Sequence, residues 1–257
     1  MPAKSQANAA SEKPGRRALR AQLTPGRAQA DPSELLRDRA RELGLHGWVR
    51  EDDGTVEVHA EGSADALEAL TSVLHELSQG APANMADARV EGHEQFAIRG
   101  VPAGVFVVQE HQATAHHFDM RLEVDGVMRS WAVPKGPSMD PSVKRLAVQV
   151  EDHDLQHNEF EGATDHGGVI VWDRGTYEHG GRVPWPAALD RGHAVFVLHG
   201  SKLRGGFALQ RTRPGAKPQW LLIKRRDDDA LPGSDVVAQS PESVLSGLTL
   251  DDVVRSA

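Results

Sequence analysis

The stretch HHFDMRLEVDGVMRSWAV (residues 116–133) decides the fold of the C-terminal part of the chain. Apolar and polar residues alternate on both sides of Asp125-Gly126, a dipeptide typical of two-residue hairpin turns. We therefore predict two antiparallel strands joined by a tight turn. Runs of the same kind, separated by turn residues, lie at 105–110, 117–124, 127–134, 145–152, 168–175, 194–200, 205–212 and 219–224. Eight short strands with almost no helical periodicity predict a closed or nearly closed antiparallel β-barrel.

The residues before Gly100 show a different pattern, in which strand-like and helix-like segments are mixed. The predicted order is a strand at 18–25, a helix at 33–43, strands at 47–51 and 55–60, a helix at 63–77 and a strand at 88–96. Ser33 and Ser63 are the expected N-caps of the two helices. The order βαββαβ predicts a ferredoxin-like domain, a sheet with two helices on one face.

The chain therefore divides into four expected parts. Residues 1–16 are polar and predicted to be disordered, and the ferredoxin-like domain covers 17–97. The barrel covers 100–230, and a C-terminal tail covers 231–257. A length of 257 residues is enough for two domains that each bury a core.

The composition restricts the chemistry that the protein can perform. The chain has no cysteine, which excludes disulfides, thiolate nucleophiles and cysteine-ligated metals, and leaves histidine and carboxylate chemistry. The N-terminus lacks the apolar core of a signal peptide, and no run approaches the roughly 18 apolar residues of a membrane span. We expect a soluble, cytoplasmic protein without a membrane partner.

Charge is distributed unevenly along the chain. The net charge of -8 argues against a polyanionic partner, yet residues 191–226 contain seven further lysines and arginines between their terminal arginines and no acidic residue. Such a stretch either binds nucleic acid or forms a solvated edge. The candidate DNA contacts are Lys202, Arg204 and Arg211, together with Lys135 in the turn WAVPKGPS.

Three potential metal ligands lie close together in the sequence. On a strand at 117–124, alternation places His117, Asp119 and Arg121 on one face, and His111 can fold back over a short loop to join them. Two imidazoles and one carboxylate suit Mn²⁺, Fe²⁺ or Zn²⁺ and leave positions open for water or substrate. Arg121 is no metal ligand, but beside a metal it suits phosphate binding. The alternative is an ordinary hydrogen-bonded surface pair.

A resemblance covers the N-terminal domain. The segment RARELGLHGWVREDDGTVEVHAEGSADALEAL (residues 39–70) resembles the middle of an acylphosphatase domain, and the likeness covers about 17–97. That family has a glycine-rich loop ending in a catalytic arginine before the first helix, and an asparagine after GWVR. Here the loop reads GRAQADPSE (26–34), and Glu51 takes the asparagine position. A glutamate there repels an anion. We therefore predict an inert domain used for contact or stability.

A second resemblance covers the predicted barrel. The segment QEHQATAHHFDMRLEVDGVMRSWAVPKGPSMDPSVKRLAVQVEDHDL (109–155) resembles the 3′-phosphoesterase module of bacterial ATP-dependent DNA ligase D, and the likeness continues to about residue 230. The segment SPESVLSGLTLDDV (240–253) is similar to the linker that follows the module. The resemblance implies an enzyme that removes a terminal 3′-ribonucleoside from DNA and then the remaining 3′-phosphate.

The same resemblance implies the roles of single residues. It implies Mn²⁺, or another divalent transition metal, bound by His111, His117 and Asp119. It also implies contacts to the scissile phosphate from Arg121, Arg145 and His153, with Gln109 and Glu151 in support. Two departures affect the expected activity. The family's tyrosine four residues after the phosphate-binding histidine is His157 here, and the loop before Val171 is shorter.

Three functions from different classes remain open at this stage. The leading one is a stand-alone Mn²⁺-dependent phosphoesterase acting on DNA or RNA-tailed DNA 3′ ends in repair and end joining, near the nucleoid, with Ku or a separate DNA ligase as partner. The second is a non-catalytic DNA-end-binding or adaptor protein. The third is a non-haem Fe²⁺ oxygenase, because two histidines and one carboxylate on a β-barrel also match that site.

Overall fold

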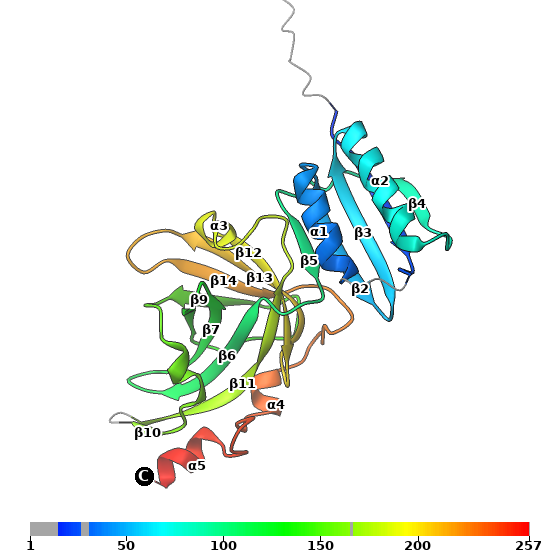
Figure 1. The fold of residues 1–257 in the computed structure, drawn as a ribbon. Coiled ribbons are helices and arrows are strands. Elements are labelled where there is room, and N and C mark those ends of the chain that lie inside the picture. The colour runs from blue at the N-terminus through cyan, green and yellow to red at the C-terminus, as the bar shows by residue number, and fades with distance from the viewer. Residues whose placement is uncertain (1–14, 27–30, 165–166, 257) are drawn as a thin grey trace, which may run out of the picture. The chain divides into compact units, whose positions relative to one another are not determined.

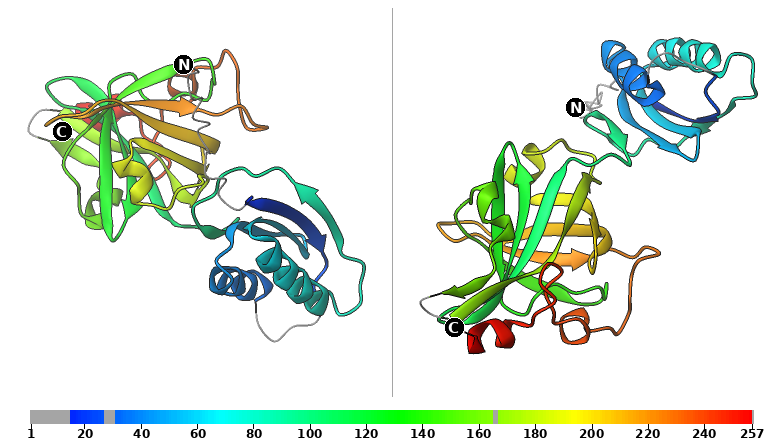
Figure 2. Two further views of the ribbon diagram at one scale, coloured as in Figure 1. Left: turned by 90° about the horizontal axis from the view of Figure 1, so that it is seen from above. Right: turned by 60° about the horizontal axis from the view of Figure 1, so that its bottom comes forward.

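The structure is a computed structural model, and it describes residues 15–26, 31–164 and 167–256. The chain separates into two compact units, Met1–Gly100 and Val101–Ala257, which are described one at a time (Figures 1 and 2). Residues 1–14 of the segment predicted to be disordered, 27–30 of the GRAQADPSE loop and 165–166 of the shortened loop lie outside the described residues.

The N-terminal unit has the predicted ferredoxin-like fold with one strand added. Its elements are β1 (Arg17–Leu23), α1 (Pro32–Glu42), β2 (His46–Asp52), β3 (Thr55–Gly62), α2 (Ala64–Ser78), β4 (Asn84–Ala88) and β5 (Phe96–Arg99). The sheet order is β4-β1-β3-β2-β5, and only the β2–β5 pair is parallel. Both helices cover one face of this sheet, where Leu36, Leu70 and Val58 belong to one buried apolar cluster (Figure 1). The other face carries polar side chains.

The helix starts are set by capping groups. Ser63 caps α2 as predicted, because its Oγ accepts a hydrogen bond from Ala66 N at 3.3 Å. The predicted N-cap of α1, Ser33, was wrong. Asp31 caps this helix by accepting hydrogen bonds from the backbone N–H groups of Ser33 and Glu34. Pro32 follows at the first helical position, where its missing N–H costs nothing.

The predicted last strand at 88–96 was also wrong, because residues 89–95 connect β4 to β5 without joining the sheet. Their backbone N–H groups have another partner. The buried carboxylate of Glu61 accepts hydrogen bonds from Glu91, Gly92 and His93 at 2.6 to 3.2 Å. Gly92 has a φ of 83°, a conformation that glycine adopts without strain and that turns the chain around the carboxylate.

The C-terminal unit is a closed antiparallel β-barrel. Its strands are β6 (Gly104–Gln112), β7 (His116–Val124), β8 (Val127–Val133), β9 (Lys144–Gln149), β10 (Gly162–Thr164), β11 (Gly167–His179), β12 (His193–Gly200), β13 (Arg204–Arg213) and β14 (Gln219–Lys224). The order is β10-β11-β12-β13-β14-β9-β8-β7-β6, and pairing of β11 with β6 closes the barrel. The eight predicted strands are confirmed. The short strand β10 and the helices η1 (Leu155–Glu159) and α3 (Ala187–Asp190) were not predicted.

Residues 231–256, which we predicted as a tail, pack against the barrel wall and contain α4 (Val236–Gln239) and α5 (Leu250–Arg255). Leu250 and Val253 bury their side chains against Ile170 of β11, and Figure 2 shows α5 beside β10 and β11. The indole of Trp172 donates a hydrogen bond to Ser240 O at 2.8 Å. Among the described residues, no helix is long and apolar enough to span a membrane.

Candidate metal and phosphate site

The register of β6 and β7 brings the three candidate metal ligands together. His111 lies directly opposite His117, and Gln109 lies opposite Asp119. Residues that face each other in an antiparallel pair have their side chains on the same side of the sheet. His111 therefore joins the cluster from the neighbouring strand β6, across the short connection to β7 over which the sequence predicts that it folds back.

The spacing of these side chains fits one metal ion. His117 Nε2 lies 3.5 Å from Asp119 Oδ1, and His111 Nδ1 lies 3.9 Å from Asp119 Oδ2. One ligand atom from each residue can be chosen so that all three are within 4.8 Å of one another. Imidazole nitrogen and carboxylate oxygen are donors that Mn²⁺, Fe²⁺ and Zn²⁺ accept. The residues present therefore fit the metal that the resemblance implies.

Hydrogen bonds and burial set the protonation of the cluster. His117 Nδ1–H donates to the carbonyl of Ala115 at 2.9 Å, which leaves Nε2 facing Asp119. Burial alone would raise the pKa of Asp119, but the hydrogen bond with His117 and the charge of Arg121 hold it below its usual value. Burial and the neighbouring His117 lower the pKa of His111. The hydrogen bond with Asp119 raises the pKa of His117, so a proton competes with a metal ion for Nε2.

Arg121 is anchored on three sides next to this cluster. Its Nη2 donates to Asp119 Oδ2 at 3.2 Å, its Nη1 to Ser130 Oγ at 3.0 Å and its Nε to Gln109 Oε1 at 3.2 Å. The side chain is only 6% exposed. The guanidinium is therefore a fixed positive charge beside two imidazoles and a carboxylate, an arrangement that suits a phosphate group.

Gln109 joins Arg121 to the segment that follows β9. Its Oε1 accepts the Arg121 hydrogen bond, while its Nε2 donates to the carbonyls of His157 and Phe160 at 3.0 and 3.2 Å. Gln109 is itself 4% exposed. All of its described hydrogen bonds join protein groups. Gln109 can therefore position Arg121 and residues 157–160, and it has no described contact that would suit it to act on a substrate directly.

His153 reaches the same face as Arg121 through backbone pairing. It forms an isolated bridge with Met128 of β8, while Ser130 of β8 lies opposite Arg121. His153 Nδ1–H donates to the carbonyl of Glu151 at 2.8 Å, so the other ring nitrogen, Nε2, is the one that can interact with a ligand. The exposed His157 lies with its ring 6.5 Å from that of His153. Glu151 therefore orients His153 through its backbone carbonyl, while its carboxylate is exposed.

The structure does not bring Arg145 to the cluster. It lies on β9 opposite Leu222, a residue of the barrel core, while Asp119 shares its side of the sheet with Ala132 and Val148. Its Nε is buried without a hydrogen-bond partner. No described hydrogen bond or ion pair links Arg145 to the histidines or to Asp119, and its contact with phosphate stays a prediction.

The candidate DNA contacts are dispersed around the barrel. Arg204 and Arg211 lie on β13, on the opposite side of the barrel from β7. Three strands separate β13 from β7 in each direction: β14, β9 and β8 in one, and β12, β11 and β6 in the other. Lys202 donates hydrogen bonds to the carbonyls of Ser240 and Glu242, and its ammonium lies 4.4 Å from the ring of Trp172. Its charge therefore serves the packing of residues 231–256.

The candidate DNA contacts Lys135 and Arg211 lie in a turn and on β13, respectively. Lys135 is exposed in the turn after β8, and Arg211 donates to the carbonyl of Asp190 while lying over the ring of Trp220. A cavity of about 580 Å³ lies beside His153, and Lys217 is among the residues that line it. Lys217 and Ser130 were not singled out from the sequence, because only the fold places them beside His153 and Arg121.

Family models match both units. A model described as the DNA Ligase D 3′-phosphoesterase domain matches residues 109–211, and a model of acylphosphatase matches residues 34–98. The chain carries an acylphosphatase domain followed by a DNA Ligase D 3′-phosphoesterase domain. The phosphoesterase match begins at Gln109 and includes every residue of the candidate site.

Individual relatives agree with these two matches. The chain is 48% identical over 154 residues to the "Multifunctional non-homologous end joining protein LigD" of Pseudomonas aeruginosa, covering 56% of this chain and 18% of that protein. It is 45% identical over 127 residues to the LigD protein of Mycobacterium tuberculosis, covering 48% and 16%. An acylphosphatase of Salinibacter ruber is 41% identical over 70 residues, covering 25% of this chain and 74% of that protein. The chain thus spans less than a fifth of the LigD proteins.

Proposed function

We propose that the barrel domain is a metal-dependent phosphoesterase that processes DNA 3′ ends in non-homologous end joining. The observation that carries the proposal is the placement of His111, His117 and Asp119 around one position, with the anchored guanidinium of Arg121 beside them. The family match and the two LigD relatives support the same chemistry. The regular pairing of β6 and β7 makes this arrangement rigid.

The proposed reaction is two successive hydrolyses. In the first, water adds at phosphorus and the bond to a terminal ribonucleoside breaks, which leaves a 3′-phosphate on the DNA. In the second, water releases that phosphate as inorganic phosphate and leaves a 3′-hydroxyl. A 3′-hydroxyl is the end that a DNA ligase joins, which makes a separate ligase the proposed recipient of the product.

The residues have distinct proposed roles in these steps. His111, His117 and Asp119 would hold Mn²⁺, whose positive charge would polarise a phosphoryl oxygen. Arg121 binds a second phosphoryl oxygen and counters the negative charge that develops. His153, oriented by the carbonyl of Glu151, holds a proton on Nε2 for the leaving oxygen.

An assay of end processing tests the proposal. The substrate is a 5′-labelled primer-template with one 3′-ribonucleotide, incubated with Mn²⁺ and resolved on a gel, followed by a matching 3′-phosphate end. We expect shortening to a 3′-phosphate and then a 3′-hydroxyl, and loss of both steps in His117→Ala and after removal of metal by a chelator. His116→Ala is the matched control, because its ring points to the other side and contacts Glu110 at 2.7 Å.

The outcome separates the proposal from a second candidate. Full activity of His117→Ala, or of the chelated protein, would rule out the metal site. A protein that binds DNA ends but processes neither substrate would instead favour an end-binding adaptor. The observation behind this second candidate is His157, which stands exposed at the position of the family's tyrosine and contacts His153 through its ring.

For the N-terminal domain we propose an inert acylphosphatase scaffold. Glu51 is exposed on β2 at the position of the family's asparagine, where its charge opposes phosphate binding. The test is acylphosphate hydrolysis by the full chain, with His117→Ala included to remove the barrel's contribution. Hydrolysis above the spontaneous rate in that variant would show that the domain is active.

A further inference from the structure

The N-terminal domain contains a second group of potential metal ligands. One ligand atom each from His59, Glu91 and His93 can be chosen so that all three lie within 4.8 Å of one another. His93 Nε2 lies 3.2 Å from Glu91 Oε2, and the rings of His59 and His93 are 5.5 Å apart. From this arrangement we infer a transition-metal site of the Zn²⁺ class in the acylphosphatase domain, held by His59, Glu91 and His93.

The burial of these side chains is unusual for their place in the fold. His59 and His93 are each 1% exposed, although they lie outside the apolar cluster that joins the sheet to the two helices. Burying polar groups costs free energy unless they are paired or bind a ligand. Here two buried imidazoles and the partly exposed carboxylate of Glu91 lie between β3 and residues 89–95.

Glu61 fixes all three candidate ligands at once. Its Oε1 lies 3.0 Å from His59 Nε2, and its carboxylate accepts the backbone N–H groups of Glu91, Gly92 and His93. A carboxylate on one ring nitrogen of a histidine is the usual partner of a metal-binding imidazole, because it orients the ring. Arg16 Nη2 lies 3.1 Å from Glu61 Oε2 and places a positive charge beside this carboxylate.

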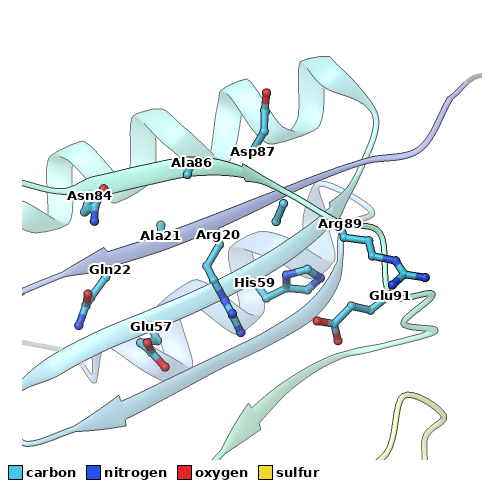
Figure 3. A pocket seen from close by; sticks show the side chains of 11 residues that line it. Arg20, Ala21, Gln22, Glu57, His59, Asn84, Ala86, Asp87, Arg89 and Glu91 are labelled. Atoms are coloured by element: carbon cyan, nitrogen blue, oxygen red, sulfur yellow. The ribbon is translucent and has the colours of Figure 1, made fainter.

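The site also has a path by which an ion can enter. A cavity of about 430 Å³ opens on the sheet between β1, β3 and β4, and both His59 and Glu91 line it (Figure 3). Figure 3 shows the carboxylate of Glu91 and the ring of His59 side by side at one end of this cavity. A Zn²⁺ ion held by two imidazoles and one carboxylate would have a fourth position for water.

Metal binding gives this inert scaffold a structural use. An ion shared by His59 on β3 and by Glu91 and His93 ties the connection between β4 and β5 to the sheet. A ligand that binds only the folded state raises the stability of that state. The inference does not rest on the activity proposed for the barrel.

Metal stoichiometry of the full chain tests the inference. The barrel cluster is first removed by His111→Ala and His117→Ala, and the tag-free protein is stripped with a chelator. Zn²⁺ is then added, excess ion is removed by gel filtration, and bound zinc is measured by mass spectrometry. We expect one equivalent in this parent protein and none after His93→Ala is added. His75→Ala is the matched control, because His75 lies exposed on α2 of the same domain.

A second variant keeps the test decisive if His93→Ala does not fold. Glu91 is partly exposed, so Glu91→Ala spares the buried histidines and should weaken Zn²⁺ binding at least about tenfold. Co²⁺ in place of Zn²⁺ gives an optical spectrum that reports the ligand geometry, and Glu91→Ala should change it. A parent protein that binds no ion, or binding unchanged in both variants, would overturn the inference. Because the barrel ligands are absent throughout, failure here leaves the end-processing assay unaffected.

Discussion

Replacing Gln109 with leucine tests whether this side chain holds the phosphate site together. Leucine has a similar volume but removes three hydrogen bonds, one from Arg121 Nε and two to the carbonyls of His157 and Phe160. Each bond contributes about 0.5–1.5 kcal/mol, and a buried donor left without an acceptor costs about 1–3 kcal/mol. Because Arg121 is almost fully buried, we expect Gln109→Leu to lower the free energy of unfolding of the barrel by about 3 kcal/mol.

Urea unfolding followed by tryptophan fluorescence measures this loss, since the barrel holds four of the chain's 5 tryptophans. Hydrogen exchange of residues 155–160 should also accelerate, because these residues lose their side-chain link to β6. Gln112→Leu is the matched control on the same strand, where the amide makes only a 3.4 Å bond to the adjacent Ala113. If Gln109→Leu and Gln112→Leu unfold at the same urea concentration, the positioning role of Gln109 is refuted.

Three further predictions concern the barrel. Lys202→Met should lower the thermal stability, because two carbonyls lose a charged donor worth about 1.5–3 kcal/mol, and it should leave affinity for DNA ends unchanged. A tenfold loss of DNA affinity in a titration would contradict this. Truncation after residue 230 should abolish the barrel's cooperative unfolding transition, followed by tryptophan fluorescence, because α4 and α5 bury apolar side chains on the barrel; an intact barrel transition would refute the packing role. Asp227→Asn should remove part of the acid sensitivity. Burial alone would raise the pKa of Asp227, but the buried ammonium of Lys224 holds it below its usual value. Its contribution is therefore full above about pH 4 and is lost as the pH falls through the lowered pKa, so the free energy of unfolding should fall more steeply in the wild type than in the variant in this window.

The sequence predicts the barrel strands well because burial on alternate sides is a local pattern. Phe118, Met120 and Leu122 enter the core, as their spacing requires, and Asp119 and Arg121 take the other side. The same locality places the polar residues of β7 on one face without knowledge of the fold. The hairpin at Asp125-Gly126 also follows from two residues, both of which adopt positive φ.

The remaining errors come from contacts between distant residues. Residues 89–95 look like a strand, but Glu61, about thirty positions earlier, takes their N–H groups. The sequence also gives no sign that the ammonium of Lys202, a candidate DNA contact, donates hydrogen bonds to the carbonyls of Ser240 and Glu242. Each of these outcomes depends on a partner that no short window of the sequence contains.

The anchoring of Arg121 would change the entropy of the substrate binding that we propose. A free arginine gives up about 2 kcal/mol of rotamer entropy when a ligand immobilises it. Here folding has already restricted the side chain, because Asp119, Ser130 and Gln109 each accept one of its N–H groups. The guanidinium has five N–H groups, so two remain for a phosphate that arrives at a cation already ordered. In the proposed phosphoesterase, the conformational cost of binding would therefore fall on the DNA end rather than on this arginine.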